Sequence, residues 1–455
     1  MPMKWRCSRF AIAAVVLGDL AWRAPDISFF LTDSGMLPRA ELWRLDQNPY
    51  AWSVHALGGS WAWQAFVMMV QAVAAVALGV GWRTRWATVI TWVLVVSLQT
   101  RNFQILQGGD VLLRCLLFWA MFLPLGARWS VDSRRTAGDP GSAGFSRVCS
   151  AASVCSAASV GISGLLKWHP AWHTEGSALW YALHLDQFAT PFGRWLRGHE
   201  TWLPWLGRAA LALELFGPFL ALCPWRNEWC RGAAVIAFMG FHLGLMMCLE
   251  LGLFPYVCWA AWTVMVPATW WNRLIPRSAM HPPLNSGARP ILPWWRETAL
   301  LMLLAYVILW NARTVSFERV AQIFPRSANV VLEVPRLDQM WSMFAPYPLR
   351  DDGWYVAAAS LSDGQRVDLI TWLPPDERQP QGPPYATERW RKYLMNLYLP
   401  ANAGWRPAAL AALKRRWEDA HPGQLVLACE LRFWRKTNRL RETPTIVVEN
   451  FAHLP

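Results

Sequence analysis

The sequence is poor in charged residues, which make up only 16% of its 455 residues, while 54% are hydrophobic. Soluble globular proteins average about 25% charged residues. A basic stripe of the kind that binds nucleic acid is also missing, because the net charge of +13 is spread over short connections between apolar runs. The composition therefore excludes an ordinary soluble domain, predicts no nucleic-acid partner and indicates a protein of the lipid bilayer.

Closely spaced cysteine pairs are missing as well. The nine cysteines include no C-x-x-C motif, and Cys429 is the single cysteine of the C-terminal region. We therefore predict no disulfide within that region. His169 and His173 are four residues apart, but Pro170 interrupts the helix that would place both on one face. No metal site is predicted.

Tryptophan is abundant, and many of the 33 tryptophans stand at the ends of apolar runs. Indole rings favour the headgroup region of a bilayer. The apolar runs predict an α-helical, multi-pass membrane bundle of about nine spans in a domain of residues 8–312. The predicted spans are residues 8–22, 62–82, 86–100, 110–127, 148–166, 202–224, 232–249, 252–270 and 297–312.

The pattern changes after residue 312. Residues 354–361 and 424–434 alternate as antiparallel strands do, with turn signals at 351–353 and 363–364, whereas 388–399 and 407–419 favour helices. The proline-rich stretch 374–384 is predicted to be a loop. We therefore expect residues 313–455 to form a water-soluble α+β module.

Basic residues favour one orientation in the membrane. They are more frequent in the connections on the side of the N-terminus, as at Arg83, Arg134 and Arg226. Since cytoplasmic connections carry an excess of Lys and Arg, the N-terminus is predicted to be cytoplasmic. An odd number of spans then places the C-terminal module outside the cytoplasm.

Several ionisable residues fall within the predicted spans, where each needs a partner or a function. Glu214 and His242 are predicted to meet, either as a structural hydrogen bond or as part of a ligand cavity. The pairs Asp19 with Arg23 and Asp110 with Arg114 have i,i+4 spacing and would neutralise each other.

Polar residues also converge on the predicted outer side. A cavity there, lined by these residues and by aromatic side chains, would suit an isoprenoid quinone or another lipid. The expected lining residues are Asp33, Asn102, Asp110, Lys167, His169, His242 and Glu250.

Lys167 is the strongest candidate for chemistry. It follows an apolar run in GLLKWHPAWHTEG, where it is either a lysine that extends to the membrane surface or a partly desolvated general base. A desolvated lysine loses its proton more readily than one in water.

Four segments resemble the bacterial HTTM (horizontally transferred transmembrane) family, a relative of vitamin K-dependent gamma-carboxylase. They are TRNFQILQGGDVLLRCLLFWAMFLPLGARWSVD, KWHPAWHTEGSALWYALHLDQFATPFGRWL, FHLGLMMCLELGLFPY and DQMWSMFAPYP. The resemblance covers residues 8–312 and continues more weakly beyond them. It implies a bacterial inner (plasma) membrane protein with a periplasmic or extracellular C-terminal module.

The resemblance also implies a role for Lys167. In the carboxylase, a lysine five residues before a tryptophan deprotonates vitamin K hydroquinone, and Lys167 and Trp172 keep this spacing. The implied cofactor is a vitamin K-like quinol. The carboxylase histidine implicated in carboxylation falls near Gly109, so carboxylation of glutamate is not implied.

Two functions follow from the sequence, and a transporter ranks below both because the sequence has no pair of matching broken helices in two halves. The first is a membrane enzyme that acts on an isoprenoid quinol or lipid, of carboxylase-like or oxygenase-like type, with Lys167 as base. The alternative is a non-catalytic membrane scaffold that presents the C-terminal module to a protein partner, which the sequence does not identify.

Overall fold

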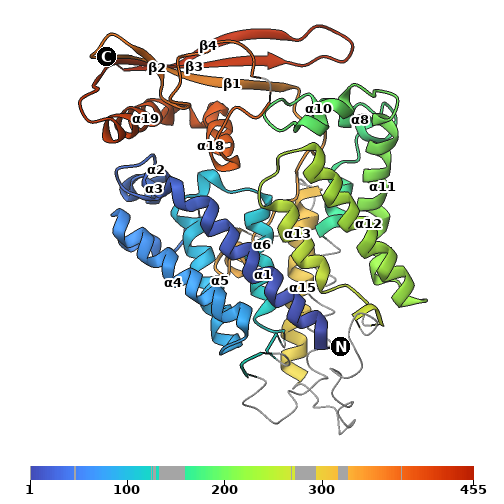
Figure 1. Cartoon of the computed structure of the whole chain (residues 1–455). Coiled ribbons are helices and arrows are strands. Elements are labelled where there is room, and N and C mark those ends of the chain that lie inside the picture. Colours follow the sequence, from blue (N-terminus) through green and yellow to red (C-terminus); the bar gives the residue numbers. More distant parts are fainter. Residues whose placement is uncertain are drawn as a thin grey trace.

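The computed structural model describes residues 2–45, 48–123, 125–126, 130–132, 159–267, 269–271, 294–315, 326–380 and 382–454. Most of these residues are helical, and a four-stranded antiparallel sheet lies near the C-terminus. Figure 1 shows three levels, in which the sheet lies at one end, two helices lie beneath it, and the larger helical part lies below them.

The first group of helices in the helical part begins with α1 (Pro2–Arg23). Its other helices are α4 (Trp61–Val80), α5 (Thr84–Arg101), α6 (Gly108–Ala120) and α13 (Phe254–Thr263), joined by the short helices α2 (Ile27–Leu31) and α3 (Arg39–Leu45). The Ser60 side chain caps the start of α4, and Gly81, at φ 76°, ends it.

A second group of helices is built on the antiparallel hairpin of α11 (Leu203–Leu222) and α12 (Asn227–Cys248). The short helices α8 (Pro170–His173), α9 (Ala178–Leu183) and α10 (Pro191–Arg197) lie at the end of this hairpin that faces the sheet (Figure 1). α15 (Trp294–Val315) and α17 (Val330–Glu333) lead toward the C-terminal module.

The C-terminal module contains strands β1 (Asp351–Leu361), β2 (Arg366–Asp368), β3 (Val426–Thr437) and β4 (Thr445–Leu454), in the order β2-β1-β3-β4. Helices α18 (Glu388–Tyr398) and α19 (Arg406–Ala420) lie between the sheet and the helical part (Figure 1). The predictions of strands at 354–361 and 424–434 and of helices at 388–399 and 407–419 are confirmed. Residues 351–353 belong to β1 and form no turn, whereas Gly364, at φ 83°, does lie in the turn between β1 and β2.

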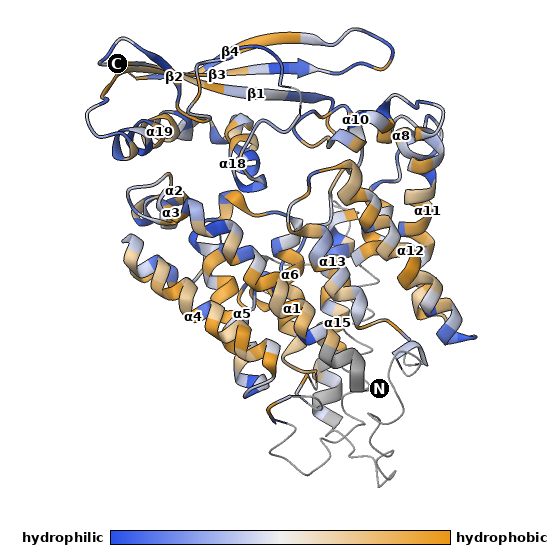
Figure 2. Cartoon of the chain, viewed as in Figure 1, coloured by the Kyte–Doolittle hydropathy of each residue, from blue (hydrophilic) through white to orange (hydrophobic). Residues whose placement is uncertain are grey.

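Three helices among the described residues are long and apolar enough to cross a membrane, namely α4, α11 and α12. They contain 20, 20 and 22 residues, which at about 1.5 Å per residue matches the ~30 Å of hydrocarbon in a bilayer. Figure 2 shows the apolar colouring along these helices, whereas the strands and the helices beneath them are mixed.

The prediction of about nine spans is wrong for the described residues. α6 and α13 have only 13 and 10 residues, so they are too short to cross. α1 and α5 are longer, but buried charged residues such as Asp19, Arg23 and Arg101 lie within them. The apolar part of α15 covers only Leu301–Val315, and the predicted span at 148–166 lies outside the described residues except for the helical residues 159–166.

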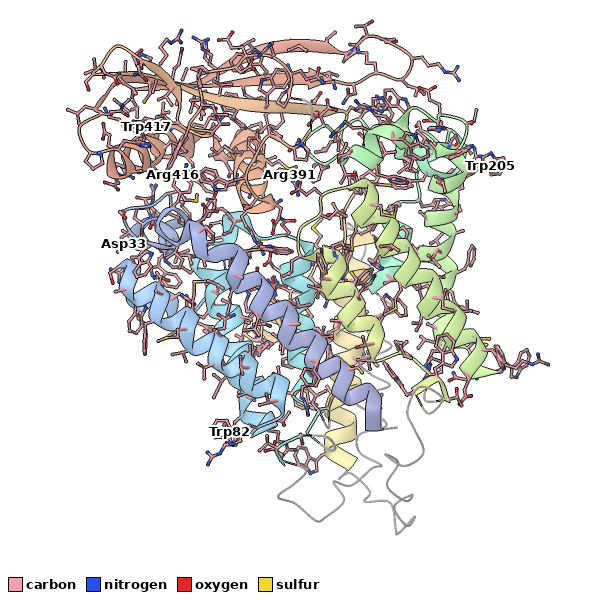
Figure 3. The ribbon with its side chains drawn as sticks, viewed as in Figure 1. Asp33, Trp82, Trp205, Arg391, Arg416 and Trp417 are labelled. Carbon is pink, nitrogen blue, oxygen red and sulfur yellow. The ribbon has the colours of Figure 1, made fainter. Side chains whose placement is uncertain are left out.

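Exposed tryptophans occur at both ends of the helical part. Trp225 and Trp205, at opposite ends of the α11–α12 hairpin, are 84% and 70% exposed. Figure 3 shows Trp82 at the end remote from the sheet and Trp205 near the sheet. Between these ends, large apolar side chains such as Phe219 of α11 and Val73 of α4 are also exposed. This distribution is typical of helices that face lipid between two headgroup zones.

Candidate functional site

Lys167 lies where the helix of residues 159–166 ends and the chain turns into α8. The His169 side chain caps α8 by accepting a hydrogen bond from the backbone N–H of Ala171 at 3.2 Å, and Pro170 occupies the first helical position. Proline suits this position because its fixed φ fits a helix start. The turn therefore holds Lys167 and Trp172 on adjoining elements.

Lys167 forms a buried ion pair with Glu214 of α11. Its Nζ lies 2.6 Å from Oε1 and 2.7 Å from Oε2 of Glu214, and the two side chains are only 8% and 10% exposed. Ser163 contacts both partners, because its hydroxyl lies 3.3 Å from Lys167 Nζ and 3.3 Å from Glu214 Oε2. Charge-assisted bonds of this length rank among the stronger hydrogen bonds in proteins.

Aromatic residues adjoin this pair. The Trp172 ring centroid lies 5.5 Å from Lys167 Nζ, within the range of a cation–π interaction. The Trp172 ring is buried, and its Nε1–H has no hydrogen-bond partner among the described residues. A buried donor without a partner costs about 1–3 kcal/mol unless something accepts its hydrogen bond. The site thus combines the Lys167–Glu214 pair with the flat ring of Trp172 and its Nε1–H, a donor without a partner among the described residues.

The predicted pairing of Glu214 with His242 is not what forms. Glu214 receives its hydrogen bonds from Lys167 and Ser163, whereas His242 Nδ1 lies 2.6 Å from the carbonyl oxygen of Phe238, one turn earlier in α12. His242 is nonetheless buried and close enough to Lys167 for their charges to interact. His242 forms its hydrogen bond within α12, so the Glu214 carboxylate is available to Lys167.

The other predicted site residues lie in separate places. Asn102 is buried and donates to the carbonyl of Phe30 at 2.8 Å, and Asp33 pairs with Arg39 at 2.8 Å. The His169 ring packs 4.8 Å from that of Tyr347. The backbone carbonyl of Glu250 accepts a hydrogen bond from Arg391 at 2.6 Å. Of the residues expected to line one outer cavity, the structure brings Lys167 and His242 near each other.

Asp110 belongs to a second buried cluster, the Arg–Asp quartet, which consists of Asp19 and Arg23 of α1, Asp110 of α6 and Arg389 of α18. Arg23 donates from Nε to both oxygens of Asp19 at 2.9 Å and from Nη2 to Asp110 at 2.7 Å. Arg389 donates from Nη2 to Asp19 at 2.8 Å and to Asp110 at 2.9 Å, and also bonds Asp110 through Nη1. Two arginines thus balance two aspartates.

The contacts of the quartet confirm the predicted Asp19–Arg23 pair and show that the predicted Asp110–Arg114 pair is wrong. Asp19 and Arg23 are paired as their spacing predicts. Arg114 does not pair with Asp110, but donates instead to the Asp338 carboxylate at 2.8 Å. Arg389 was not predicted, because an arginine on a helix of a soluble module is normally exposed. Its position beside Trp390 offers no sequence signal of burial.

Further polar contacts join α18 to the helical part. Arg391, labelled in Figure 3, donates to the carbonyls of Gln187 and Glu250 and lies 4.3 Å from the ring centroid of Phe188. A hollow beside the quartet, lined by Trp22, Phe30, Arg389 and neighbours, has about 10 Å³. It has room for about one water molecule, so a larger ligand requires side chains to move there.

Gly109 is packed tightly against the start of α13. A Cβ at Gly109 would lie 2.9 Å from the backbone N and Cα of Phe254. Any side chain would collide with the start of α13 there, and backbone atoms cannot move aside as a flexible side chain can. Position 109 therefore has no room for a histidine.

A third polar cluster joins β1 to the segment before α10. Asp352 accepts from the backbone N–H of Asp186 at 2.5 Å and from Gln187 Nε2 at 2.8 Å, and Asp186 accepts from Lys436 Nζ at 2.6 Å. Burial, and then the charge of Asp186, raise the pKa of Asp352 to about 6. Burial also raises the pKa of Asp186, but Lys436 and Arg197 more than offset this and leave it lowered.

This cluster predicts a pH-dependent stability. The folded protein keeps the Asp352 proton up to about pH 6, whereas the unfolded chain releases it near pH 4. The contribution of Asp352 to the free energy of unfolding should therefore fall by about 2–3 kcal/mol as the pH rises from 4 to 7. Thermal unfolding of the wild type and Asp352→Asn across this range measures the difference in slope. Asp363→Asn, in an exposed turn, should keep the wild-type slope, and an equal slope in Asp352→Asn would contradict the assignment.

No group of three or more His, Cys, Asp or Glu side chains in the described ranges could hold a metal ion. The buried Lys167–Glu214 pair joins the helix of residues 159–166 to α11, and the quartet joins α18 to α1 and α6. No protein-family model, curated protein or solved structure matches this chain.

Proposed function

We propose that the protein is a multi-pass integral membrane protein in which Lys167 and Glu214 move a proton of an isoprenoid quinol or a similar lipid. The observation that carries this proposal is the buried Lys167–Glu214 pair beside Trp172, whose Nε1–H has no partner in the described part of the chain. The lysine-to-tryptophan spacing that resembles the carboxylase lies in this same cluster.

The residues at this site fit a hydroxyl-bearing aromatic ligand. The Trp172 Nε1–H can donate to a ligand oxygen, and its ring offers a flat apolar wall. When bound, a quinol supplies an acidic hydroxyl and two-electron redox chemistry. The chain supplies the acceptor of that hydroxyl proton, which is Lys167 Nζ.

Proton movement requires Glu214 as well as Lys167. In the ion pair Lys167 carries the proton, so it cannot accept another. Transfer of one N–H proton from Lys167 to Glu214 gives an amine and a carboxylic acid. Lys167 Nζ can then take the hydroxyl proton: the ligand O–H bond breaks, an N–H bond forms, and Glu214 retains the proton it received.

The direct test is Lys167→Arg. Arginine keeps the positive charge beside Glu214 but does not deprotonate in proteins, so it preserves the ion pair and removes the base. We expect at least a 100-fold loss of turnover, the usual order for loss of a general base. The assay follows oxidation of a reduced short-chain naphthoquinone by dioxygen, which yields the quinone and hydrogen peroxide, in purified detergent-solubilised protein. Lys414→Arg is the matched control, and wild-type turnover in Lys167→Arg would refute the role.

We also propose the orientation, with a cytoplasmic N-terminus and the C-terminal module on the periplasmic or extracellular side of a bacterial inner membrane. The excess of basic residues on the N-terminal side supports it. A reporter that is active only outside the cytoplasm should work when fused after Pro455 and should fail when inserted after Arg135. Activity at the second position alone would reverse the orientation.

A scaffold function has one specific observation in its favour. The Arg–Asp quartet and Arg391 fix the C-terminal module rigidly on the helical part, as presentation of that module to a protein partner requires. Mass spectrometry of the purified protein separates the two functions. A co-purified quinone or lipid that is lost when Lys167→Met is combined with Glu214→Met favours the enzyme, and protein without such a ligand favours the scaffold.

A further inference from the structure

Two cysteines meet at the connection between α11 and α12, at the end of the hairpin remote from the sheet (Figure 1). Cys223 directly follows α11, and Cys230 lies in the first turn of α12. Six residues separate the two cysteines in the sequence. Six intervening residues match no familiar cysteine motif, so the sequence alone gives no sign of the pair.

The thiols share a single acceptor. Sγ of Cys223 and Sγ of Cys230 each lie 3.4 Å from the carbonyl oxygen of Trp225, which brings the two thiols close together. Asn227 stabilises this loop by donating from Nδ2 to the carbonyl of Cys223 at 2.7 Å. The connection therefore holds both sulfur atoms on the same side of the turn.

Accessibility and proximity make this pair suited to thiol–disulfide exchange. Both cysteines are half-buried, whereas Cys115, Cys258 and Cys429 are buried in the interior. A disulfide oxidant can therefore reach either sulfur, and the second sulfur lies in the same short connection.

We propose that Cys223 and Cys230 form a redox dithiol that closes to an intramolecular disulfide by exchange with a disulfide oxidant. One thiolate attacks a sulfur of the oxidant, forms a mixed disulfide and expels one thiol. The second thiolate then attacks the protein sulfur, closes the Cys223–Cys230 bond and expels the second thiol. Overall, two protein thiols become one disulfide, and one oxidant disulfide becomes two thiols.

Closure would covalently join the ends of two candidate membrane-spanning helices. The dithiol goes beyond the function proposed for Lys167, since it lies in the connection that follows α11 and involves none of the same residues. On the orientation proposed above it faces the cytoplasm, a reducing compartment in which protein disulfides are mostly transient and redox-sensing. The reduced dithiol is then the resting form.

The experiment titrates the purified, full-length protein in detergent with mixtures of reduced and oxidised glutathione and counts maleimide-reactive cysteines by mass spectrometry. We expect two reactive cysteines to disappear together, with loss of two hydrogen atoms and a cross-link within residues 223–230. In Cys223→Ser the cross-link should be absent, and Cys230 should instead retain one glutathione. Cys248→Ser, a half-buried cysteine at the other end of α12, should titrate as wild type does.

Three results would overturn the proposal. Cys223 and Cys230 could remain reactive at all glutathione ratios, or each could take up glutathione independently without cross-linking. A disulfide that joins two copies of the chain, seen as a dimer on a non-reducing gel, would equally exclude the intramolecular dithiol. None of these outcomes depends on quinol turnover.

Discussion

Replacing Arg389 with methionine is expected to lower the free energy of unfolding by about 3–5 kcal/mol, the usual cost of removing one partner from a buried ion pair. The side chains of Arg389, Asp19 and Asp110 are at most 3% exposed. Without Arg389, one arginine is left to balance two buried carboxylates. The cost arises from the uncompensated charge, because these carboxylates are almost entirely removed from bulk solvent.

The comparison variants separate charge from packing. Arg389→Lys keeps the charge but cannot bond both aspartates in the same plane, so it should be intermediate. Adding Asp110→Asn to Arg389→Met restores charge balance and should recover much of the loss. Arg378→Met removes an arginine that is 88% exposed from an ion pair in the same module and should leave the unfolding transition unchanged.

Chemical denaturation in detergent, followed by tryptophan fluorescence, measures these differences. Equal midpoints for wild type and Arg389→Met would show that the quartet does not stabilise the fold. A second readout is limited proteolysis, since the C-terminal module should become easier to cleave from the helical part when Arg389 is lost. Digestion at the wild-type rate would contradict the role of Arg389 in docking.

Local features were the most predictable from the sequence. The alternation in residues 354–361 and 424–434 sets which side chains share a face, and strands form there. The i,i+4 spacing of Asp19 and Arg23 predicts a contact on one helix, and the contact forms. Both features depend on the periodicity of the backbone, which is determined by residues close together in the sequence.

Features that depend on distant elements were not predictable. Arg389 meets Asp110 across 279 residues, and Lys167 meets Glu214 across 47. Nothing in the local sequence distinguishes Arg389 from an exposed arginine. Glu214 could pair with His242 or with Lys167, and the sequence does not decide between them. The count of spans failed for a related reason, because several apolar runs form short or charge-bearing helices that pack against other protein.

Lys167→Met is the second substitution with a large expected effect. At a solvent-exposed helix end, methionine would be readily accommodated. The structure leads to the opposite expectation, because Lys167 is buried and its loss leaves the Glu214 carboxylate with Ser163 as its remaining hydrogen-bond partner in the described part of the chain. We expect the free energy of unfolding to fall by about 3–5 kcal/mol.

A double-mutant cycle isolates the interaction. Lys167→Met with Glu214→Met replaces both charges by apolar groups, and such replacements are often neutral or stabilising, so the double variant should be more stable than Lys167→Met alone. Arg439→Met, which breaks an exposed pair with Glu442, is the matched control and should have no measurable effect. Additive losses in the cycle would mean that Lys167 and Glu214 do not interact.

The cycle also decides how activity data should be interpreted. A loss of turnover in Lys167→Met alone could reflect unfolding as well as loss of the base. The double variant removes that ambiguity, because it should fold and still lack an amine at this position. If it folds and turns over quinol at the wild-type rate, Lys167 is a structural partner of Glu214 and the site performs no proton transfer. If it folds and is inactive, and Lys167→Arg is also inactive, the amine itself is required.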